Sequence, residues 1–514
     1  MLAAIQLDLL GFQIIATCLT KQGKDDLERV CSQRTKVFLL DVTKSKQIKE
    51  VYSEVNHFIP KDVGLWALIN NAGIFIPGPV EWQPLDAFKR TADVNLWGVI
   101  DMTKTFLPLV RKAQGRIVNL SSIAAYKTTL MNEEYMKRSW NKQWEDLSDE
   151  AKNVYDDEYR GKAFKAFRNT FSTASDDIGM VVRALEVAVT SKAPRDRYLI
   201  GLTARVLAFI AFLPSAIVDT LVNFAVPASF GSCDKGFGML AAIQLDLLGF
   251  QIIATCLTKQ GKDDLERVCS QRTKVFLLDV TESKQIKEVY SEVNHFIPKD
   301  VGLWALINNA GIFIPGPVEW QPLDAFKRTA DVNLWGVIDM TKTFLPLVRK
   351  AQGRIVNLSS IAGLMSFTYM SAYCITKFGV ETFSDVLRRE VKPWGVKVIL
   401  IEPSAYKTTL VNEEYMKRSW NKQYEDLSDE AKNVYDDEYR GKAFKALRNT
   451  FSTASDDIGM VVRALEVAVT SKAPRDRYLI GLTARVLAFI AFLPSAIVDT
   501  LANFAVPASF GSKK

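Results

Sequence analysis

Histidine is almost absent from this 514-residue chain, which contains only His57 and His295. Two scattered imidazoles nearly exclude catalytic triads that depend on histidine and histidine-rich metal sites. The six cysteines show no spacing typical of a metal site or a disulfide framework, and we expect free thiols. No basic block or aromatic–basic stripe indicates a nucleic-acid-binding surface, although the net charge is +7.

A long apolar run of membrane-spanning length is lacking as well. The most apolar stretch near the C-terminus, Val486–Val498, is short, contains Pro494 and is followed by Asp499. A spanning helix needs about 20 apolar residues. The stretch therefore predicts a buried element, a lid over a substrate pocket or an interfacial membrane segment, and the residues alone leave all three open.

What the sequence does contain is a long internal repeat. Residues 1–124 recur at 239–362, and residues 125–232 recur at 405–512. The copies differ at the paired positions Lys44/Glu282, Met131/Val411, Trp144/Tyr424, Phe167/Leu447 and Val222/Ala502. The repeat is far too long for a solenoid, so we interpret it as a tandem duplication of one domain.

The first copy is incomplete. It has no counterpart of residues 363–404, and no glycine-rich turn precedes Met1 as one precedes Met239. We therefore predict a truncated copy over 1–232 and a near-complete domain over 233–514. Because the letters after Met1 recur after that turn, we expect them to form a helix rather than a signal peptide.

Apolar runs rich in Val, Ile and Leu alternate with helical patterns, as in a doubly wound parallel α/β sheet. The expected strands of the second copy are Phe250–Cys256, Lys274–Leu278, Leu303–Ile307, Ile355–Leu358, Val396–Ile401 and Arg477–Ile480. Helices are expected to begin near Lys262, Glu282, Pro322, Thr368 and Asp456. The sequence thus predicts a Rossmann-like sheet that is present twice, incompletely in the first copy.

One stretch of the second copy, residues 357–377, combines residues that can transfer a proton. Tyr373 and Lys377 lie four apart on an expected helix, so their side chains share one face. An ammonium close to a phenol favours the phenolate and lowers a pKa that starts near ~10. Such a phenol can exchange a proton with an alcohol or a carbonyl near neutral pH. Ser360 follows a buried strand and is expected to hydrogen-bond the reacting oxygen.

Three further motifs accompany this pair: C-D-K-G-F-G at 233–238, I-N-N-A-G at 307–311 and D-V-N-L-W-G at 331–336. Together the motifs resemble the short-chain dehydrogenase/reductase superfamily, and most closely its membrane-associated retinol and hydroxysteroid dehydrogenase branch. The resemblance implies an oxidoreductase that interconverts a hydrophobic alcohol and its carbonyl with a nicotinamide cofactor. It assigns catalytic roles to Asn333, Ser360, Tyr373 and Lys377, with Tyr373 as the acid/base and Asn333 supporting a proton relay.

The resemblance also implies which residues contact the cofactor. The pyrophosphate would lie on the glycine-rich turn, where a helix N-terminus presents free N–H groups. The implied contacts are Asp234, Lys235, Gly236, Phe237, Gly238, Asp279, Val280, Asn308, Asn309, Ala310, Gly311, Tyr373, Lys377, Pro403 and Thr408. The nearby Lys259 suits the 2′-phosphate of NADP, whereas relatives with a similar C-L-T phrase mostly use NAD, which we favour.

The glycine-rich turn departs from the family pattern. Gly231 and Ser232 stand where the family has Thr-Gly, and Pro227 lies where a first strand would run, although proline cannot donate to a sheet ladder. A milder departure is Ser404 in place of a glycine after Pro403. If the junction over 229–238 does not form a strand and a phosphate turn, the chain is a non-catalytic duplicated pseudoenzyme acting in membrane or partner binding.

The first copy retains the N-N-A-G motif at 70–73, Asn95 and Ser122, but no paired tyrosine and lysine. Its Tyr126 is the counterpart of Tyr406, not of Tyr373, because the catalytic helix falls in the gap. We therefore expect the first copy to be catalytically dead and to leave sheet edges exposed.

Substrate and location follow from the resemblance alone. We expect a small hydrophobic substrate, a peripheral membrane contact through the C-terminal apolar segment, and an intracellular site at the endoplasmic-reticulum membrane or in the cytoplasm; a homo-oligomer is compatible with the sequence. The polar, aromatic-dotted residues 411–455 predict either a substrate cover or a solvated helix pair. A hydroxybutyrate-like hydroxy-acid dehydrogenase is a further alternative, favoured if a basic residue of 405–440 faces the pocket.

Overall fold

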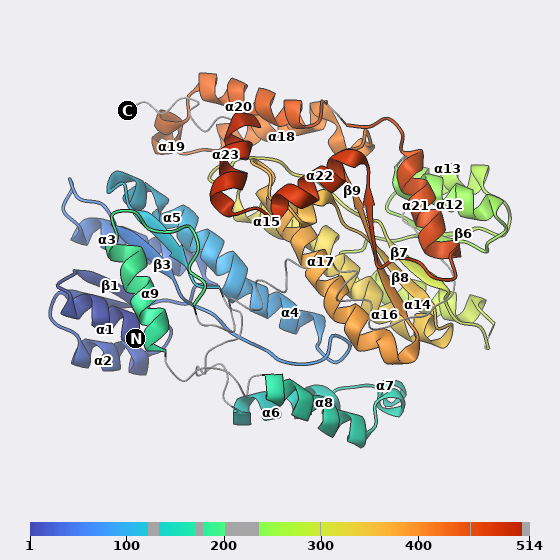
Figure 1. The fold of residues 1–514 in the computed structure, drawn as a ribbon, viewed down its shortest axis with the longest axis horizontal. Helices are drawn as coiled ribbons and strands as arrows, with labels where there is room; N and C mark the ends of the chain where they lie inside the picture. The colour runs from blue at the N-terminus through green and yellow to red at the C-terminus, as the bar shows by residue number, and fades with distance from the viewer. Residues whose placement is uncertain (122–132, 171–177, 201–235, 299, 453, 506–514) are drawn as a thin grey trace. The chain divides into compact units, whose positions relative to one another are not determined.

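The computed structural model describes residues 1–121, 133–170, 178–200, 236–298, 300–452 and 454–505. The chain divides into two compact units, Met1–Val218 and Asp219–Lys514 (Figure 1). The point of division lies outside the described residues, so the domain boundary after residue 232 stays a prediction. Both units alternate short parallel strands with helices, which confirms the α/β class.

In the second unit, four parallel strands form the main sheet in the order β10-β9-β8-β7, and β5 and β6 form a separate parallel pair. The strands are β5 (Ile253–Cys256), β6 (Lys274–Leu277), β7 (Ala305–Asn308), β8 (Arg354–Leu358), β9 (Lys397–Pro403) and β10 (Arg477–Ile480). All six overlap strands that the apolar runs predict. Strand β8 pairs on both sides, with Asn357 opposite Asn308 on β7 and Leu400 on β9.

Helices alternate with these strands. They are α12 (Phe237–Leu247), α13 (Lys259–Val268), α14 (Ser283–Phe296), α15 (Leu323–Ala330), α16 (Gly336–Lys350), α17 (Ser371–Val391), α18 (Glu413–Glu425), α19 (Asp429–Val434), α20 (Asp437–Thr450), α21 (Gly459–Thr470), α22 (Leu482–Ala491) and α23 (Ser495–Ala505). Side chains of a strand point alternately to its two faces. Val356 and Leu358 pack into the core with α12 and α21, whereas Asn357 bonds Ser384 of α17, so the sheet is covered on both faces (Figure 1).

Three helix starts lie three residues from their predicted positions: α21, which begins at Gly459 instead of near Asp456, and two others that have local reasons. Helix α17 begins at Ser371 instead of near Thr368, because Tyr369 has a left-handed backbone with φ +67° that interrupts helical geometry. Helix α13 begins at Lys259 instead of near Lys262. The Thr258 side chain caps it by accepting a hydrogen bond from the Gly261 N–H at 3.1 Å.

In space, no strand of the described residues lies between β5 and β7, although β6 lies between them in the sequence. A narrow apolar cavity occupies this place, with Ile253 and Thr255 of β5 on one side and Leu306 and Ile307 of β7 on the other. The strand predicted from the family pattern at this position falls on residues outside the described ranges, as does the 229–235 part of the junction.

The first unit has two separate parallel pairs, β1 with β2 and β3 with β4. Its strands are β1 (Ile14–Cys18), β2 (Thr35–Leu39), β3 (Ala67–Asn70) and β4 (Arg116–Asn119). Its helices are α1 (Leu2–Leu9), α2 (Lys21–Val30), α3 (Ser45–Phe58), α4 (Leu85–Ala92), α5 (Val99–Lys112), α6 (Glu133–Glu145), α7 (Asp149–Val154), α8 (Asp157–Thr170) and α9 (Gly179–Thr190). Its core lies between β2, α3 and α5.

The incomplete copy exposes a sheet edge, as its sequence predicts. Strand β4 has the same letters as the first four residues of β8, but Asn119 is exposed and the other three residues are only half-buried. In β8 all five residues are buried. The difference arises because the first copy has no counterpart of residues 363–404, which supply all of α17 and β9.

Near the C-terminus, Val486–Val498 belongs to two short helices, α22 and α23, separated at Pro494. Within the part of the chain that the structure describes, no helix is both long and apolar enough to cross a bilayer. Large apolar side chains are exposed here, including Leu482 and Phe489 of α22 and Phe492 directly after it.

Candidate active site

The predicted proton-transfer residues come together where β8 ends and α17 begins. Ser360 follows β8 and accepts a hydrogen bond from the Ala362 N–H at 3.1 Å, which starts a short 3₁₀ helix at Ile361–Gly363. Tyr373 and Lys377 lie one turn apart on α17 and are 8% and 5% exposed. The Lys377 Nζ donates to the Leu358 carbonyl at 2.8 Å and lies 5.5 Å from the centre of the Tyr373 ring.

Burial dominates the electrostatics of this pair. It raises the pKa of Tyr373 above its usual value, and the Ser360 hydroxyl opposes the shift only in part. Burial also lowers the pKa of Lys377 to about 8, against the opposing charge of Glu381. The sequence predicts a lowered tyrosine pKa from the ammonium alone; in the folded chain without cofactor, desolvation of the phenolate outweighs that effect.

Asn333 lies in a π-helical turn, η3 (Asp331–Trp335), between α15 and α16. Such turns are rare and frequently occur at functional sites. The Asn333 amide accepts from the Ile312 N–H at 2.8 Å and donates to the Ile312 carbonyl at 2.9 Å. It also donates to the Thr376 hydroxyl on α17 at 3.2 Å. Asn333 therefore ties the loop after β7 to the helix that carries Tyr373 and Lys377.

The N-N-A-G motif follows β7 directly. The Asn308 amide donates to the Asn357 side chain at 2.8 Å and to the Thr341 hydroxyl at 3.0 Å, so it ties β7 to β8 and α16. Asn309 and Ala310 line the cavity beside β7. A Cβ added at Gly311 would lie 3.6 Å from the Asn333 oxygen, an ordinary van der Waals contact, so the motif glycine lies directly beside Asn333.

The remaining predicted cofactor residues lie on several segments of the second unit. Gly236, Phe237 and Gly238 form the N-terminal end of α12, whereas Asp234 and Lys235 lie outside the described residues. Asp279 follows β6, and its carboxylate accepts from the Thr281 N–H at 2.9 Å. Val280 packs so closely on Gly336 that a Cβ added there would meet it at 2.9 Å. Pro403 ends β9, and Thr408 precedes a short 3₁₀ helix.

These groups fit a dinucleotide. A helix N-terminus with glycines suits a pyrophosphate, because its N–H groups are unpaired and its dipole end is positive. A buried ammonium and two hydroxyls, on Lys377, Tyr373 and Ser360, suit the hydroxyls of a ribose and of an alcohol. In parallel α/β sheets ligands bind at the carboxyl ends of the strands, and β7, β8 and β9 all end at these residues.

An aromatic wall borders the tyrosine. The Phe313 ring lies edge-on to Tyr373, with centroids 5.3 Å apart, and Phe451 packs on Phe313 at 5.6 Å. Trp420 of α18 is buried against Trp320 and Tyr369, so residues 411–455 are not a purely solvated helix pair. They cover the same apolar cluster that contains Tyr373.

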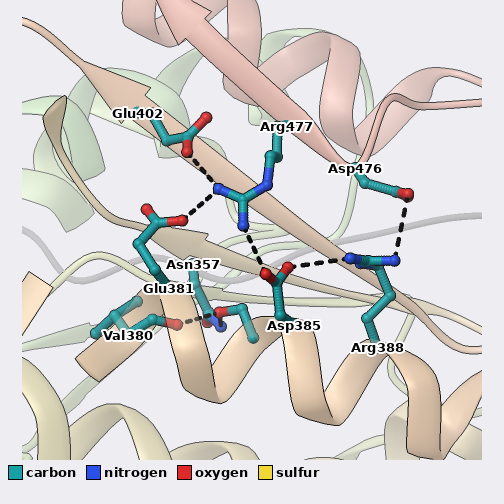
Figure 2. A network of polar contacts seen from close by, with 9 residues as sticks. Asn357, Val380, Glu381, Asp385, Arg388, Glu402, Asp476 and Arg477 are labelled. Atoms are coloured by element: carbon teal, nitrogen blue, oxygen red, sulfur yellow. Dashed lines mark hydrogen bonds and ion pairs between the residues drawn. The ribbon is translucent and has the colours of Figure 1, made fainter. Parts of the chain in front are cut away.

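Sequence reasoning did not identify the polar network behind α17. Figure 2 shows Arg477 of β10 between three carboxylates, Glu381 and Asp385 of α17 and Glu402 of β9. Glu381 and Asp385 continue the spacing of four that separates Tyr373 from Lys377, and this spacing could have drawn attention to them. No local spacing indicates that Arg477 is their partner, because 96 residues separate it from Glu381.

In the first unit, Asn95, the counterpart of Asn333, keeps both hydrogen bonds to the Ile74 backbone. The third bond has no equivalent, because the first copy has no counterpart of Thr376. The counterpart positions Ser122 and Tyr126 lie outside the described residues. The catalytic inactivity of the first copy stays a prediction.

The comparisons with known proteins agree with this geometry. The family model described as short chain dehydrogenase matches residues 3–136 and 231–419. Retinol dehydrogenase 7 of Rattus norvegicus is 41% identical over 275 residues, which are 53% of this chain and 85% of that protein. Short-chain dehydrogenase/reductase family 9C member 7 of Homo sapiens is 40% identical over 277 residues, 54% of this chain and 88% of that protein.

Among solved structures, a short-chain dehydrogenase from Streptomyces avermitilis is 23% identical, with a TM-score of 0.43, over 54% of this chain and 94% of that one. The family match lies on both copies and on more than half of the residues, and it includes the helix with Tyr373 and Lys377. The chain belongs to the short-chain dehydrogenase family.

Proposed function

We propose that the second unit is an oxidoreductase that interconverts a hydrophobic alcohol and its carbonyl with NAD or NADP. The observation that carries the proposal is the buried arrangement of Tyr373, Lys377 and Ser360 at the carboxyl end of β8. Family membership supports the reaction class, and the names of the retinol dehydrogenase relatives support an alcohol of the retinoid kind.

Each residue of the site has a separate role. Tyr373 accepts the proton of the substrate hydroxyl, or donates one to the carbonyl in the reverse direction. Lys377 stabilises the phenolate by its positive charge and offers its ammonium to the cofactor ribose. Ser360 donates a hydrogen bond to the reacting oxygen, and Asn333 holds α17 in place through Thr376. A bound nicotinamide supplies the hydride acceptor or donor.

NAD is the cofactor we favour, although two features oppose each other. The segment after β5 contains no acidic residue that would bind the ribose hydroxyls and reject NADP, and Lys259 is exposed at the start of α13. The resemblance of the C-L-T phrase at the end of β5 to the retinol and hydroxysteroid dehydrogenase branch favours NAD. Titration of the purified chain with NADH and NADPH, followed by fluorescence, decides between them.

A hydrophobic substrate fits the wall beside Tyr373. Phe313 and Phe451 offer apolar ring surfaces next to the phenol, and α18 and α20 cover this cluster. Truncating Phe451 to Ala should raise KM for a retinoid or steroid alcohol more than it lowers kcat, since it removes apolar contact without touching the proton-transfer groups.

We also propose a peripheral membrane contact through α22 and α23. Leu482 is 78% and Phe489 is 69% exposed, and Val486 lies between them on the same side of α22. These exposed apolar side chains are suited to the headgroup boundary of a bilayer. Replacing Leu482 and Phe489 with Ser should reduce co-flotation of the chain with phospholipid vesicles; unchanged flotation would refute the contact.

The decisive experiment replaces Tyr373 with Phe in the full-length chain. The variant should still bind dinucleotide but lose turnover by roughly 10²–10⁴-fold, the usual contribution of a general acid/base. Tyr415→Phe is the matched control, because Tyr415 is 46% exposed on α18 and should not affect turnover. Full activity in Tyr373→Phe would overturn the assignment, and absence of dinucleotide binding in the wild type would favour the pseudoenzyme.

A further inference from the structure

A row of ionisable side chains runs along α17 beyond the catalytic pair. Tyr373, Lys377, Glu381 and Asp385 follow one another at intervals of four, so each lies one helical turn from the next. The Glu381 side chain is 7% exposed, although a carboxylate is costly to bury. Its immediate neighbour toward the active site is Lys377, whose ammonium is equally buried.

Glu381 shares a hydrogen-bond donor with a carboxyl group from another element. The same nitrogen of Arg477, Nη1, donates to Glu381 at 2.5 Å and to Glu402 at 2.6 Å (Figure 2). The other nitrogen, Nη2, donates to Asp385 at 2.9 Å. Farther out, Arg388 donates to Asp385 at 3.0 Å and faces Asp476 at 3.8 Å.

The two glutamates cannot both be ionised without a large cost. Glu402 is completely buried, and one oxygen of each carboxyl, Glu381 Oε1 and Glu402 Oε2, has no hydrogen-bond partner among the described residues. Two carboxylates that converge on one donor repel each other, and in such pairs one group usually keeps its proton. Burial raises the pKa of both Glu381 and Glu402; Arg477 offsets this only in part, and the Ser359 hydroxyl opposes it further at Glu381.

The position of that proton matters to the active site. A negative charge on Glu381 lies next to Lys377 on the same helix and favours its ammonium form, which burial disfavours. A negative charge on Glu402 lies on β9, on the far side of Arg477 from α17 (Figure 2). The groups that face Glu381 are Lys377 and Asp385 from α17, Glu402 from β9 and Arg477 from β10.

We propose that Glu381 and Glu402, which accept from the same nitrogen of Arg477, hold one proton between them. The part of the negative charge that remains on Glu381 keeps Lys377 in its charged form. Glu381 is thus a positioning residue that acts on Tyr373 through Lys377. The role in turnover rests on the proposed dehydrogenase function, whereas the shared proton and its effect on Lys377 do not.

The proposal predicts opposite effects for two isosteric substitutions at the same donor. Glu381→Gln removes the charge next to Lys377, leaves the negative charge on Glu402 and should lower the Lys377 titration midpoint by about one pH unit. Glu402→Gln ends the sharing, leaves Glu381 fully ionised and should raise the midpoint. If the cluster only holds β9 and β10 against α17, the two substitutions should not move the Lys377 midpoint in opposite directions.

The test is NMR titration of the full-length chain labelled with ¹⁵N at lysine Nζ, with the Lys377 signal assigned by its loss in Lys377→Met. Asp385→Asn is the matched control, since it removes a carboxylate of the same Arg477 one turn farther from Lys377 and should shift the midpoint less than Glu381→Gln. Midpoints that move in opposite directions support the proposal. Midpoints that move together, or not at all, overturn it.

Two features keep the test independent of folding and of turnover. If Glu381→Gln does not fold, the direction of the Glu402→Gln shift decides the question alone. The midpoint needs no substrate, so an inactive wild type would refute the dehydrogenase and leave the carboxyl pair to be judged by NMR. In an active enzyme, Glu381→Gln should also move the high-pH decline of kcat/KM to lower pH, because activity falls as Lys377 loses its proton.

Discussion

Arg477 offers the sharpest stability test, because the duplication supplies its own control. In the second unit the Arg477 side chain is 20% exposed and pairs with Glu381, Glu402 and Asp385. Its counterpart Arg197 has the same following residues, Y-L-I, but is exposed, since the first copy lacks counterparts of these three acidic residues. Arg477→Met and Arg197→Met therefore remove the same side chain from two different environments.

The expected cost differs greatly between the two sites. Removing one partner of a buried ion pair typically costs about 3–5 kcal/mol, because the remaining charges stay buried and uncompensated. A surface substitution away from such contacts usually changes stability by less than about 0.5 kcal/mol. Because about 1.4 kcal/mol is a factor of ten, Arg477→Met should reduce protection against hydrogen exchange roughly 10²–10⁴-fold.

Mass-spectrometric hydrogen exchange on peptides from 363–404 measures this loss. These residues have no counterpart in the first copy, so their peptides report on the second unit alone. The loss should also depend on pH. The folded-state pKa values of Glu381 and Glu402 are raised, so stability from their neutral forms is complete below about 4.3 and is lost as pH rises through the folded values.

Removing Arg477 raises both pKa values further, so its cost should be largest near pH 8 and smaller near pH 5. Equal loss of protection in Arg477→Met and Arg197→Met would refute the ion-pair account. If the loss of protection in Arg477→Met does not change with pH, the claim that Arg477 compensates the buried carboxylates of Glu381 and Glu402 is refuted.

Other predictions concern glycines and a buried carboxylate. Gly353→Ala should destabilise the second unit by roughly 1–3 kcal/mol in chemical denaturation, because its Cβ would lie 2.4 Å from the Trp304 carbonyl oxygen. Gly441→Ala, inside α20 with no atom within 4 Å of the added Cβ, should stabilise it by about 0.5–1 kcal/mol. Asp246→Asn should cost roughly 1–3 kcal/mol, since the Asp246 carboxylate accepts from the Ser270 N–H at 2.8 Å and hydroxyl at 2.6 Å. Burial raises the pKa of Asp246, but the Ser270 hydrogen bonds outweigh burial and lower the pKa overall. The stability difference between the wild type and Asp246→Asn should therefore disappear as pH falls below about 4 and the carboxylate is protonated.

Local patterns predicted the parts of the fold that depend on local sequence. Apolar runs located the strands because a strand buried on both faces must be apolar along its whole length. The spacing of Tyr373 and Lys377 predicted their shared face because a helix places residues four apart one above the other. Even there, the left-handed backbone of Tyr369 moved the helix start, and nothing in the neighbouring letters indicated it.

The parts that depend on long-range contacts were not predictable. Arg477 meets Glu381 and Glu402 only after β10 pairs with β9 and α17 packs on β9, and no local pattern encodes that meeting. The raised pKa of Tyr373 follows from its burial, which a helical spacing cannot reveal. The same letters are buried in β8 and half-exposed in β4, so burial of a strand is set by the elements beside it.

The most direct test of the account is steady-state turnover of the purified full-length chain with NAD and NADP on retinoid and steroid alcohols, in wild type and Tyr373→Phe. The wild type should reduce the dinucleotide and oxidise the alcohol, while Tyr373→Phe should still bind dinucleotide but turn over at least about 10²-fold more slowly. Turnover that survives in Tyr373→Phe, or a wild type that binds neither dinucleotide, would contradict it.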